Sequence, residues 1–164
     1  MDGRILTLSL LFVCALGGPS RVAAADLGHW SVLPLPRSCI AVNRPPAEFD
    51  AFPANALVLT RRRSAGETEL QVWFWPGYLE GFTSGELNIA ATAANRRAIA
   101  VRPVEHAPDK AVSARLSAED GAWKALLDGG TVSAWLAGRQ ETLTFDVSDL
   151  PAVLSALDGC VSTP

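Results

Sequence analysis

The chain has 164 residues, of which 49% are hydrophobic, and it carries a formal net charge of −3. This length is typical of one domain with its own hydrophobic core. The acidic balance argues against nucleic acid as a partner, because such binding depends on many Lys and Arg contacts to phosphate. With only two histidines and no His-Glu-x-x-His motif, the sequence has too few ligands for a common zinc site, so we expect neither a metal nor a cofactor.

The first twenty-five residues have the pattern of a secretory signal peptide. Arg4 gives a positive start, Ile5–Leu16 is an apolar run, and Ala23–Ala25 offers a small-residue cleavage site. The run is too short for a membrane-spanning helix, which needs roughly 20 apolar residues, and no other segment is long enough. We therefore expect cleavage of residues 1–25, and a single globular β-rich domain over residues 26–164 that is periplasmic or secreted.

Cleavage of this segment changes how the cysteines are interpreted. Cys14 leaves with the signal peptide, so that only Cys39 and Cys160 remain in the mature chain. In an oxidising compartment such an isolated pair usually forms a disulfide. Closing a loop of roughly 120 residues is worth about 4 to 5 kcal/mol on the loop-entropy model. No Cys-x-x-Cys motif is present, which argues against redox catalysis.

Short apolar or alternating runs between Gly, Pro, Asn and Ser clusters predict strands in the first two thirds of the mature chain. The predicted strands are Trp30–Leu33, Cys39–Val42, Ala56–Arg61, Leu70–Trp75, Leu87–Ala91 and Ile99–Arg102. Ser64–Glu67 is typical of a hairpin loop between the third and fourth of them. In that hairpin the alternating apolar residues are expected to share one face; they are Leu57, Leu59, Leu70, Val72 and Phe74.

The last third of the chain predicts a helix followed by a hairpin. Ser117–Asp120 has the form of a capping box, and the apolar residues after it fall on one helical face before Gly129 and Gly130 end the helix. Thr131–Ala137 and Gln140–Val147 then flank Gly138-Arg139, a glycine-first pair suited to a type II′ turn. This turn sets the following residues opposite each other: Ala134 and Leu143, Val132 and Phe145, Ser133 and Thr144, Trp135 and Thr142.

A final helix is predicted over Asp149–Asp158. Ser148 is expected to cap it, Pro151 lies in its first turn, Gly159 is expected to end it, and Cys160 would then stand just beyond it. Its apolar residues repeat at helical spacing; they are Leu150, Val153, Leu154 and Leu157. Together these elements predict an α+β fold, a β-rich single domain with a two-layer or sandwich-like antiparallel sheet and two C-terminal helices.

Both ends of the mature chain weakly resemble a known family. The residues that carry the resemblance are Trp30-Ser-Val32, Cys39-Ile-Ala41, Ala125-Leu-Leu-Asp-Gly-Gly130, Thr131-Val-Ser133, Phe145-Asp-Val-Ser-Asp-Leu150 and Ala156-Leu157. They are similar to segments of the invasion-associated locus B family and related small periplasmic proteins of unknown function. Here Leu33–Ser38 separates the first tryptophan from the cysteine, where family members often have a shorter interval. The resemblance implies a β-rich periplasmic or surface domain, and it transfers no catalytic motif.

One stretch is unusually aromatic. Trp73–Phe82 contains five aromatic residues, and strand alternation places Trp73 and Trp75 on the face opposite Phe74. If both faces of the sheet are covered, these indoles belong to the core. If one face is open, they form with Tyr78 and Phe82 an exposed patch, which is typical of ligand or partner binding.

The functional prediction rests on the aromatic stretch Trp73–Phe82 and on the lack of a recognisable catalytic motif. We expect an exported, non-catalytic envelope or periplasmic protein that binds a ligand or partner, an unknown protein or envelope component, through the aromatic residues. An alternative is a small periplasmic hydrolase that uses His106, although no Gly-x-Ser-x-Gly motif is present. Another alternative is a structural accessory subunit of an envelope complex. A hydrogen bond from His106 to a serine, threonine or carboxylate would favour the hydrolase.

Overall fold

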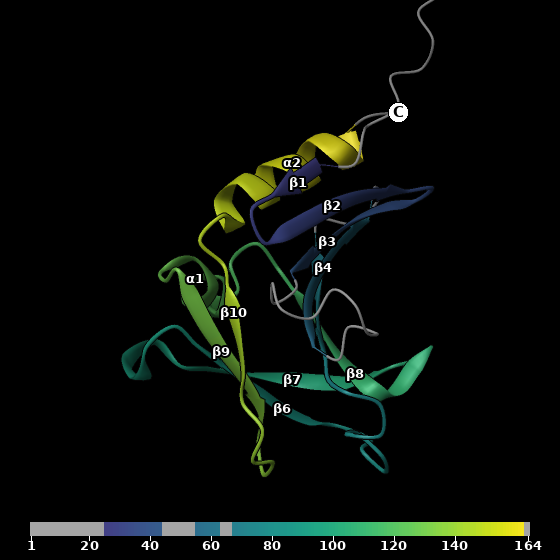
Figure 1. Ribbon diagram of the computed structural model, residues 1–164, viewed down its shortest axis with the longest axis vertical. Coiled ribbons are helices and arrows are strands. Elements are labelled where there is room, and N and C mark those ends of the chain that lie inside the picture. The colour runs from purple at the N-terminus through teal and green to yellow at the C-terminus, as the bar shows by residue number, and fades with distance from the viewer. Residues whose placement is uncertain (1–24, 44–54, 63–66, 163–164) are drawn as a thin grey trace, which may run out of the picture.

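The computed structural model describes residues 25–43, 55–62 and 67–162 (Figure 1). In those ranges, ten strands, two α-helices and one short 3₁₀ helix (Ala93–Asn95) follow one another along the chain. The strands are β1 (Ala25–Leu27), β2 (Trp30–Leu35), β3 (Ser38–Asn43), β4 (Ala56–Arg62), β5 (Thr68–Trp73), β6 (Gly85–Ala90), β7 (Arg97–Val104), β8 (Ala107–Leu116), β9 (Thr131–Leu136) and β10 (Leu143–Asp146). The helices are α1 (Gly121–Leu127) and α2 (Leu150–Ser162).

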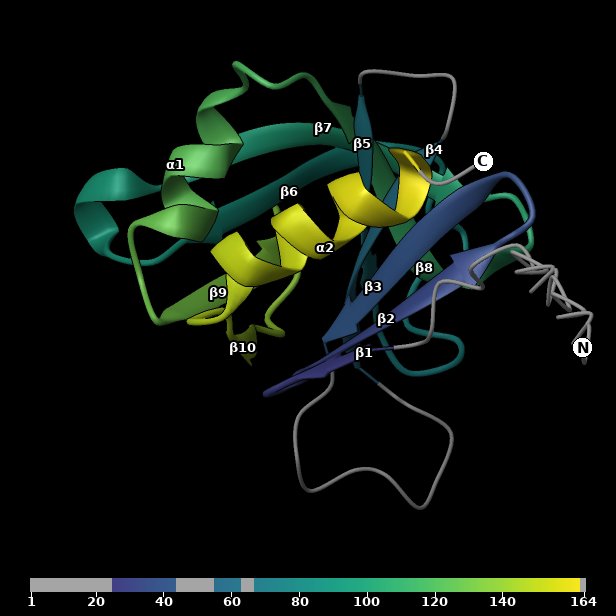
Figure 2. The same cartoon turned by 90° about the horizontal axis from the view of Figure 1, so that it is seen from above.

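The strands form one antiparallel sheet in the order β1-β2-β3-β4-β5-β8-β7-β6-β9-β10. β7 joins its two halves, because Arg97–Val101 pairs with β6 while Arg102 and Pro103 pair with β8. A register shift between Pro103 and Val104 interrupts the ladder beside this junction. The strongly curved sheet wraps around the core, and α2 crosses one of its faces (Figures 1 and 2).

The predicted β-rich α+β fold, with an antiparallel sheet and two helices toward the C-terminus, is confirmed. The six predicted strands correspond to β2 through β7, but β1 and β8 are absent from the prediction. The polar segment Pro108–Lys110 breaks the alternating pattern at the start of β8. The strand nevertheless pairs with β5 through Ala111–Leu116, and with β7 through Ala107, Val112 and Ser113. The predicted loop Ser64–Glu67 lies outside the described residues except for Glu67.

The β4–β5 hairpin supplies the centre of the core. Leu57 lies opposite Val72, and Leu59 lies opposite Leu70. These four residues and Phe74 are all at most 1% exposed, as the alternating pattern predicts. Their common face belongs to the main core, in which α2 packs against β4, while the intervening residues point to the other side of the sheet.

α1 begins later than its predicted cap. Its first residue is Gly121, and the carboxylate of Asp120 caps it by accepting a hydrogen bond from the Ala122 N–H at 2.8 Å. The predicted capping box at Ser117 is therefore wrong; the carbonyl of Ser117 accepts a hydrogen bond from the indole N–H of Trp123 instead. Asp120 is as good a cap as serine, and it lies directly before the apolar face of the helix.

The β9–β10 hairpin has the predicted register but a different turn. Ala134 pairs with Leu143, Ser133 with Thr144 and Val132 with Phe145, whereas Trp135 and Thr142 lie beyond the paired residues. The Arg139 N–H donates to the Leu136 carbonyl at 3.1 Å, and Gly138 has φ +78°. The turn is thus centred on Ala137-Gly138, with glycine at the position where a type II turn needs a positive φ.

α2 is longer than predicted. It continues through Gly159 and includes Cys160, so Gly159 does not end it. The buried side chains of Leu150, Val153, Leu157 and Cys160 hold every turn against the sheet, which outweighs the roughly 1 kcal/mol cost of a helical glycine. The Ser148 hydroxyl donates to Asp146 at 2.6 Å instead of capping the helix.

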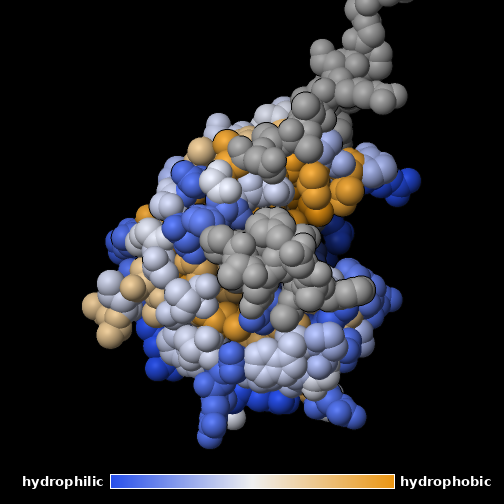
Figure 3. Space-filling view, viewed as in Figure 1, coloured by the Kyte–Doolittle hydropathy of each residue, from blue (hydrophilic) through white to orange (hydrophobic). Residues whose placement is uncertain are grey.

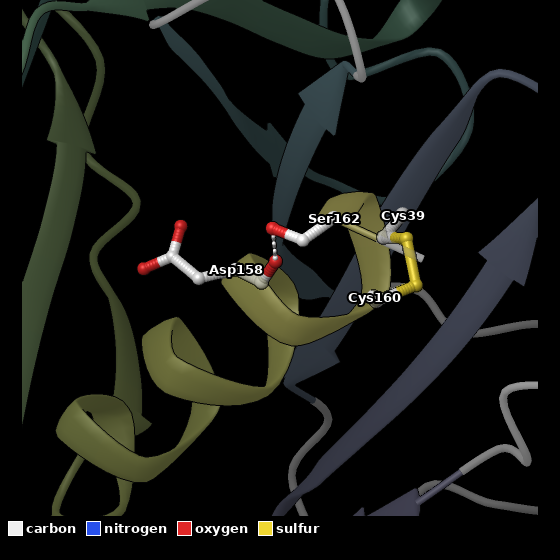
Figure 4. The surroundings of a disulfide bond; sticks show 4 residues. All are labelled: Cys39, Asp158, Cys160 and Ser162. Atoms are coloured by element: carbon white, nitrogen blue, oxygen red, sulfur yellow. Dashed lines mark hydrogen bonds between the residues drawn. A yellow bond between two sulfur atoms is a disulfide. The ribbon is translucent and has the colours of Figure 1, made fainter. Parts of the chain in front are cut away.

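The predicted disulfide between Cys39 and Cys160 is present and joins β3 to α2 (Figure 4). Both cysteines are at most 1% exposed, and their Cα atoms are 6.2 Å apart. Two residues before Cys160 on α2, Asp158 forms an ion pair with Arg61 of β4, while its carbonyl accepts a hydrogen bond from the Ser162 hydroxyl. Burial lowers the pKa of Arg61. The C-terminal helix is therefore fastened to two neighbouring strands.

The predicted signal peptide lies outside the described residues, apart from Ala25 at the start of β1. Among the helices that the structure describes, none combines the length and the apolar character needed to cross a membrane.

Candidate functional site

A groove of about 990 Å³ lies on the face of the sheet opposite α2. We call it the open-face groove. The β2–β3 and β7–β8 hairpins border it, and both are visible at the right of Figure 1. Its lining residues come from six neighbouring strands, β2, β3, β4, β5, β8 and β7, and from the β7–β8 turn: Leu35, Ser38, Ile40, Val42, Ala56, Val58, Thr60, Arg62, Glu69, Gln71, Trp73, Ala100, Arg102, Pro103, Val104, Glu105, His106, Ser113, Ala114 and Arg115.

Strand register explains why these side chains meet. One row across the sheet contains Val42, Val58, Gln71, Ser113 and Arg102, each directly opposite the next on the adjacent strand. Because side chains alternate along a strand, residues two positions away extend the same surface above and below this row. The open-face groove is thus the surface that the alternating pattern leaves on the side away from the helices.

Trp73 lies at the end of β5 and is half-buried in the open-face groove. Its indole N–H donates to the Gln71 side-chain carbonyl at 3.0 Å, and the Gln71 amide donates to Glu69 at 3.0 Å. The other oxygen of Glu69 is 3.7 Å from the Arg62 guanidinium. This chain of contacts along β5 fixes the orientation of the indole ring.

Cationic and aromatic groups surround the same ring. The His106 ring lies 6.1 Å from it, centroid to centroid, at a tilt of 50°, and the Lys110 ammonium lies 5.6 Å from its centroid. Both residues belong to the β7–β8 hairpin, which folds over the end of β5. Trp73 is therefore partly covered by this hairpin, and it remains partly exposed to a molecule in the groove.

The other aromatic candidates lie away from the open-face groove. Tyr78 stacks on the buried Phe74 at 4.6 Å and meets Trp75 edge-on at 4.5 Å. Arg139 lies over the Tyr78 ring at 5.3 Å and donates to its carbonyl at 2.6 Å. Burial raises the pKa of Tyr78, and the Arg139 charge opposes this effect. Phe82 packs, half-buried, against the main core.

The four predicted binding residues thus occupy two places. Trp73 belongs to the open-face groove, whereas Trp75 and Tyr78 form a cluster in the loop after β5, with Phe82 packed on the core beneath. Trp75 does not share the face of Trp73 because β5 ends at Trp73, and the alternation of a strand does not extend to the residues that follow.

Sequence reasoning missed the polar residues of the groove. Ser113 and Arg115 lie two positions apart on β8, and Arg102 lies opposite Ser113 on β7. The signal that could have found them is their alternation with buried Val112, Ala114 and Leu116, which is visible once Ala107–Leu116 is recognised as a strand.

His106 has no acid or base partner in the part of the chain that the structure describes. It contacts the Trp73 ring but forms no hydrogen bond or ion pair there with a serine, threonine or carboxylate. His29 instead lies 3.4 Å from Asp146. No cluster of three or more potential metal ligands occurs among the described residues. The geometry therefore gives the hydrolase interpretation no support.

Comparisons with known proteins found no matching family model, no similar curated protein and no similar solved structure.

Proposed function

We propose that this protein is an exported, non-catalytic envelope or periplasmic protein that binds a ligand or partner in the open-face groove. The observation that carries the proposal is the groove itself, a concave surface of about 990 Å³ with a half-buried tryptophan held by hydrogen bonds. Binding sites are typically concave and combine apolar surface with a few oriented polar groups. Trp73 supplies the aromatic group expected of such a site.

Three observations support export of the protein and a binding function. The first twenty-five residues have the pattern of a signal peptide, and a disulfide fits the oxidising compartment to which such a signal leads. His106 packs on Trp73 without an acid or base partner in the described ranges, which favours binding over hydrolysis. Membership of the invasion-associated locus B family stays a prediction.

Ligand-induced changes in amide NMR signals test the proposed site. Sodium decanoate, maltotriose and a tetraglutamate peptide represent three ligand classes, and each is titrated into the ¹⁵N-labelled oxidised protein. We expect at least one of them to shift amide signals of β5 and β8 selectively. Trp73→Ala should remove that response, whereas Trp135→Ala, which truncates a half-buried tryptophan outside the groove, should retain it.

The melting temperature of Trp73→Ala distinguishes an effect on binding from an effect on folding. A melting temperature within a few degrees of the unmodified protein shows that Trp73→Ala acts on binding and not on folding. If none of the three probes shifts groove signals, or if the shifts survive Trp73→Ala, binding in the open-face groove is contradicted.

Intact mass tests the export part of the proposal. Protein recovered from the compartment where it accumulates should lack residues 1–25, and reduction should add the mass of two hydrogens. Retention of the segment would contradict export by this signal, and an unchanged mass on reduction would contradict the disulfide.

A further inference from the structure

Two arginines form a basic wall along one side of the open-face groove. Arg102 lies opposite Ser113, and Arg115 follows Ser113 by two residues, so their side chains project from the same face. Diagonal positions of this kind lie about 7 to 8 Å apart. Both arginines are exposed, and neither forms a hydrogen bond or ion pair with any residue in the described ranges. Two guanidinium groups at this spacing suit an acidic oxygen group.

The opposite wall of the groove is aliphatic. It is formed by Leu35, Ile40, Val42 and Val58 on β2, β3 and β4. Leu35 is 42% exposed, and on the same hairpin Leu33 is 38% exposed. Hydrophobic surface over β2 is visible in Figure 3. A ligand that contacts both walls must therefore be amphiphilic.

The net charge of the groove lining favours one kind of acidic head group on the ligand over another. Among the described lining residues, three arginines and two glutamates give a net charge of +1 when histidine is left out of the count. Arg62 is already paired with Glu69, so among the described lining residues the remaining charges are Arg102, Arg115 and Glu105, which sum to a net charge of +1. A carboxylate neutralises it, whereas a phosphate monoester, with a charge of about −1.5 to −2, leaves an excess of negative charge.

The distance between the walls sets the length of the ligand. Arg115, Glu69, Thr60 and Ile40 lie opposite one another on four successive strands. Three strand spacings of about 4.8 Å give roughly 14 Å, which a saturated chain of about ten to twelve carbons spans. We propose that the open-face groove binds a free linear carboxylate of this length, with its head group on Arg102 and Arg115 and its chain along the aliphatic wall. This inference rests on the proposed function.

Isothermal titration calorimetry with linear carboxylates of increasing chain length tests the proposed ligand. The probes are hexanoate, octanoate, decanoate and dodecanoate below their micelle-forming concentrations, with decanol as the neutral analogue of decanoate. We expect affinity to rise about two- to fourfold for each added methylene, since each buried CH₂ contributes about 0.8 kcal/mol when fully covered. The rise should level off once the chain exceeds the aliphatic wall.

Paired variants separate the two walls. R102Q/R115Q should weaken decanoate binding at least tenfold and leave decanol binding unchanged. R37Q/R97Q removes the same charge from exposed positions outside the groove and should bind decanoate like the unmodified protein. V42N should weaken decanoate and decanol alike, because it places an amide on the aliphatic wall.

The results that overturn the inference are specific. Equal affinity for hexanoate and decanoate would exclude the chain, and unchanged decanoate binding by R102Q/R115Q would exclude the head-group site. Binding to vesicles of anionic phospholipid without binding to monomeric decanoate would assign the groove to a membrane surface. If decanoate fails but maltotriose or the tetraglutamate peptide still shifts groove signals, the ligand class is wrong and the proposed function stands.

Discussion

At the scale of single residues, Gly28 shows how one position can depend on the absence of a side chain. It forms the β1–β2 turn with His29 and has φ +58°. A Cβ atom built on it would fall 2.0 Å from a carboxylate oxygen of Asp149, at the start of α2. The Asp149 side chain can rotate away from such an atom, so the positive φ is the constraint that favours glycine here.

Gly28→Ala should lower the free energy of unfolding by about 1 to 2 kcal/mol, the usual cost of a left-handed conformation for a residue with a Cβ, while the Asp149 side chain rotates to make room. Urea unfolding of the oxidised protein measures this. Gly130→Ala is the matched control, because nothing lies within 4 Å of its added Cβ and its φ is not positive. Equal stability of the two variants would contradict the argument.

Asp146 links the end of β10 to the segment before α2. It accepts hydrogen bonds from the Ser148 hydroxyl at 2.6 Å and the Ser148 N–H at 3.0 Å, with His29 nearby. The Ser148 hydroxyl, and then its N–H, hold the pKa of Asp146 below its usual value. A carboxyl whose pKa is lowered by folding contributes stability above its unfolded pKa of about 3.9, and this contribution is lost as the pH falls below that value.

Asp146→Ala should therefore destabilise the protein at pH 6 and have a smaller effect at pH 2.5. Since the side chain is exposed and solvent screens it, we expect a loss below about 1 kcal/mol at pH 6. Urea unfolding at both pH values, with Glu119→Ala as an exposed control, measures the difference. A loss of the same size at both pH values would show that ionisation of Asp146 does not contribute.

At the scale of elements, β5 serves two functions through its two faces. Leu70 and Val72, followed by Phe74, point into the core, while Gln71 and Trp73 point into the open-face groove. The element therefore couples the packing of the domain to the position of the candidate site.

Replacement of the two neighbouring aromatics should separate these functions. Phe74→Ala should cost about 3 to 5 kcal/mol, because its ring is fully buried, whereas Trp73→Ala should cost less than half of that. Chemical unfolding monitored by circular dichroism gives both values. If Trp73→Ala proves as costly as Phe74→Ala, Trp73 belongs functionally to the core.

At the scale of the whole molecule, one disulfide joins parts of the chain that lie 121 residues apart. It fastens the C-terminal helix to β3, and the Arg61–Asp158 ion pair supports the same attachment from β4. The helix in turn covers the face of the sheet that carries Leu57 and Leu59.

Replacement of both cysteines by alanine should lower the free energy of unfolding by about 4 to 5 kcal/mol, the loop-entropy estimate for a closure of this length. Urea unfolding compares this variant with the oxidised protein. Arg61→Gln, which breaks only the partly exposed ion pair, should cost much less. A loss below about 1 kcal/mol for the double cysteine variant would show that packing alone holds α2.

The sequence by itself determined the elements whose pattern is local. Alternation predicted β2 through β7 and the shared face of Leu57, Leu59, Leu70, Val72 and Phe74, and the cysteine count with the predicted signal peptide indicated the disulfide. The register of the β9–β10 hairpin also followed from its own residues, because side chains on paired strands must keep apolar and polar faces apart.

Only the tertiary structure decided where α2 ends and where the open-face groove lies. Glycine is typical of a helix end, and the local sequence therefore predicts that α2 ends at Gly159. Burial of Cys160 and its bond to Cys39 keep Gly159 in the helix. The groove unites Trp73, Arg102 and Arg115 from three strands, and β8 lies between β5 and β7 although β6 and β7 precede it in the chain. The β7–β8 hairpin is local, but its pairing with β5 is set by long-range packing, so no local pattern could bring its arginines beside Trp73.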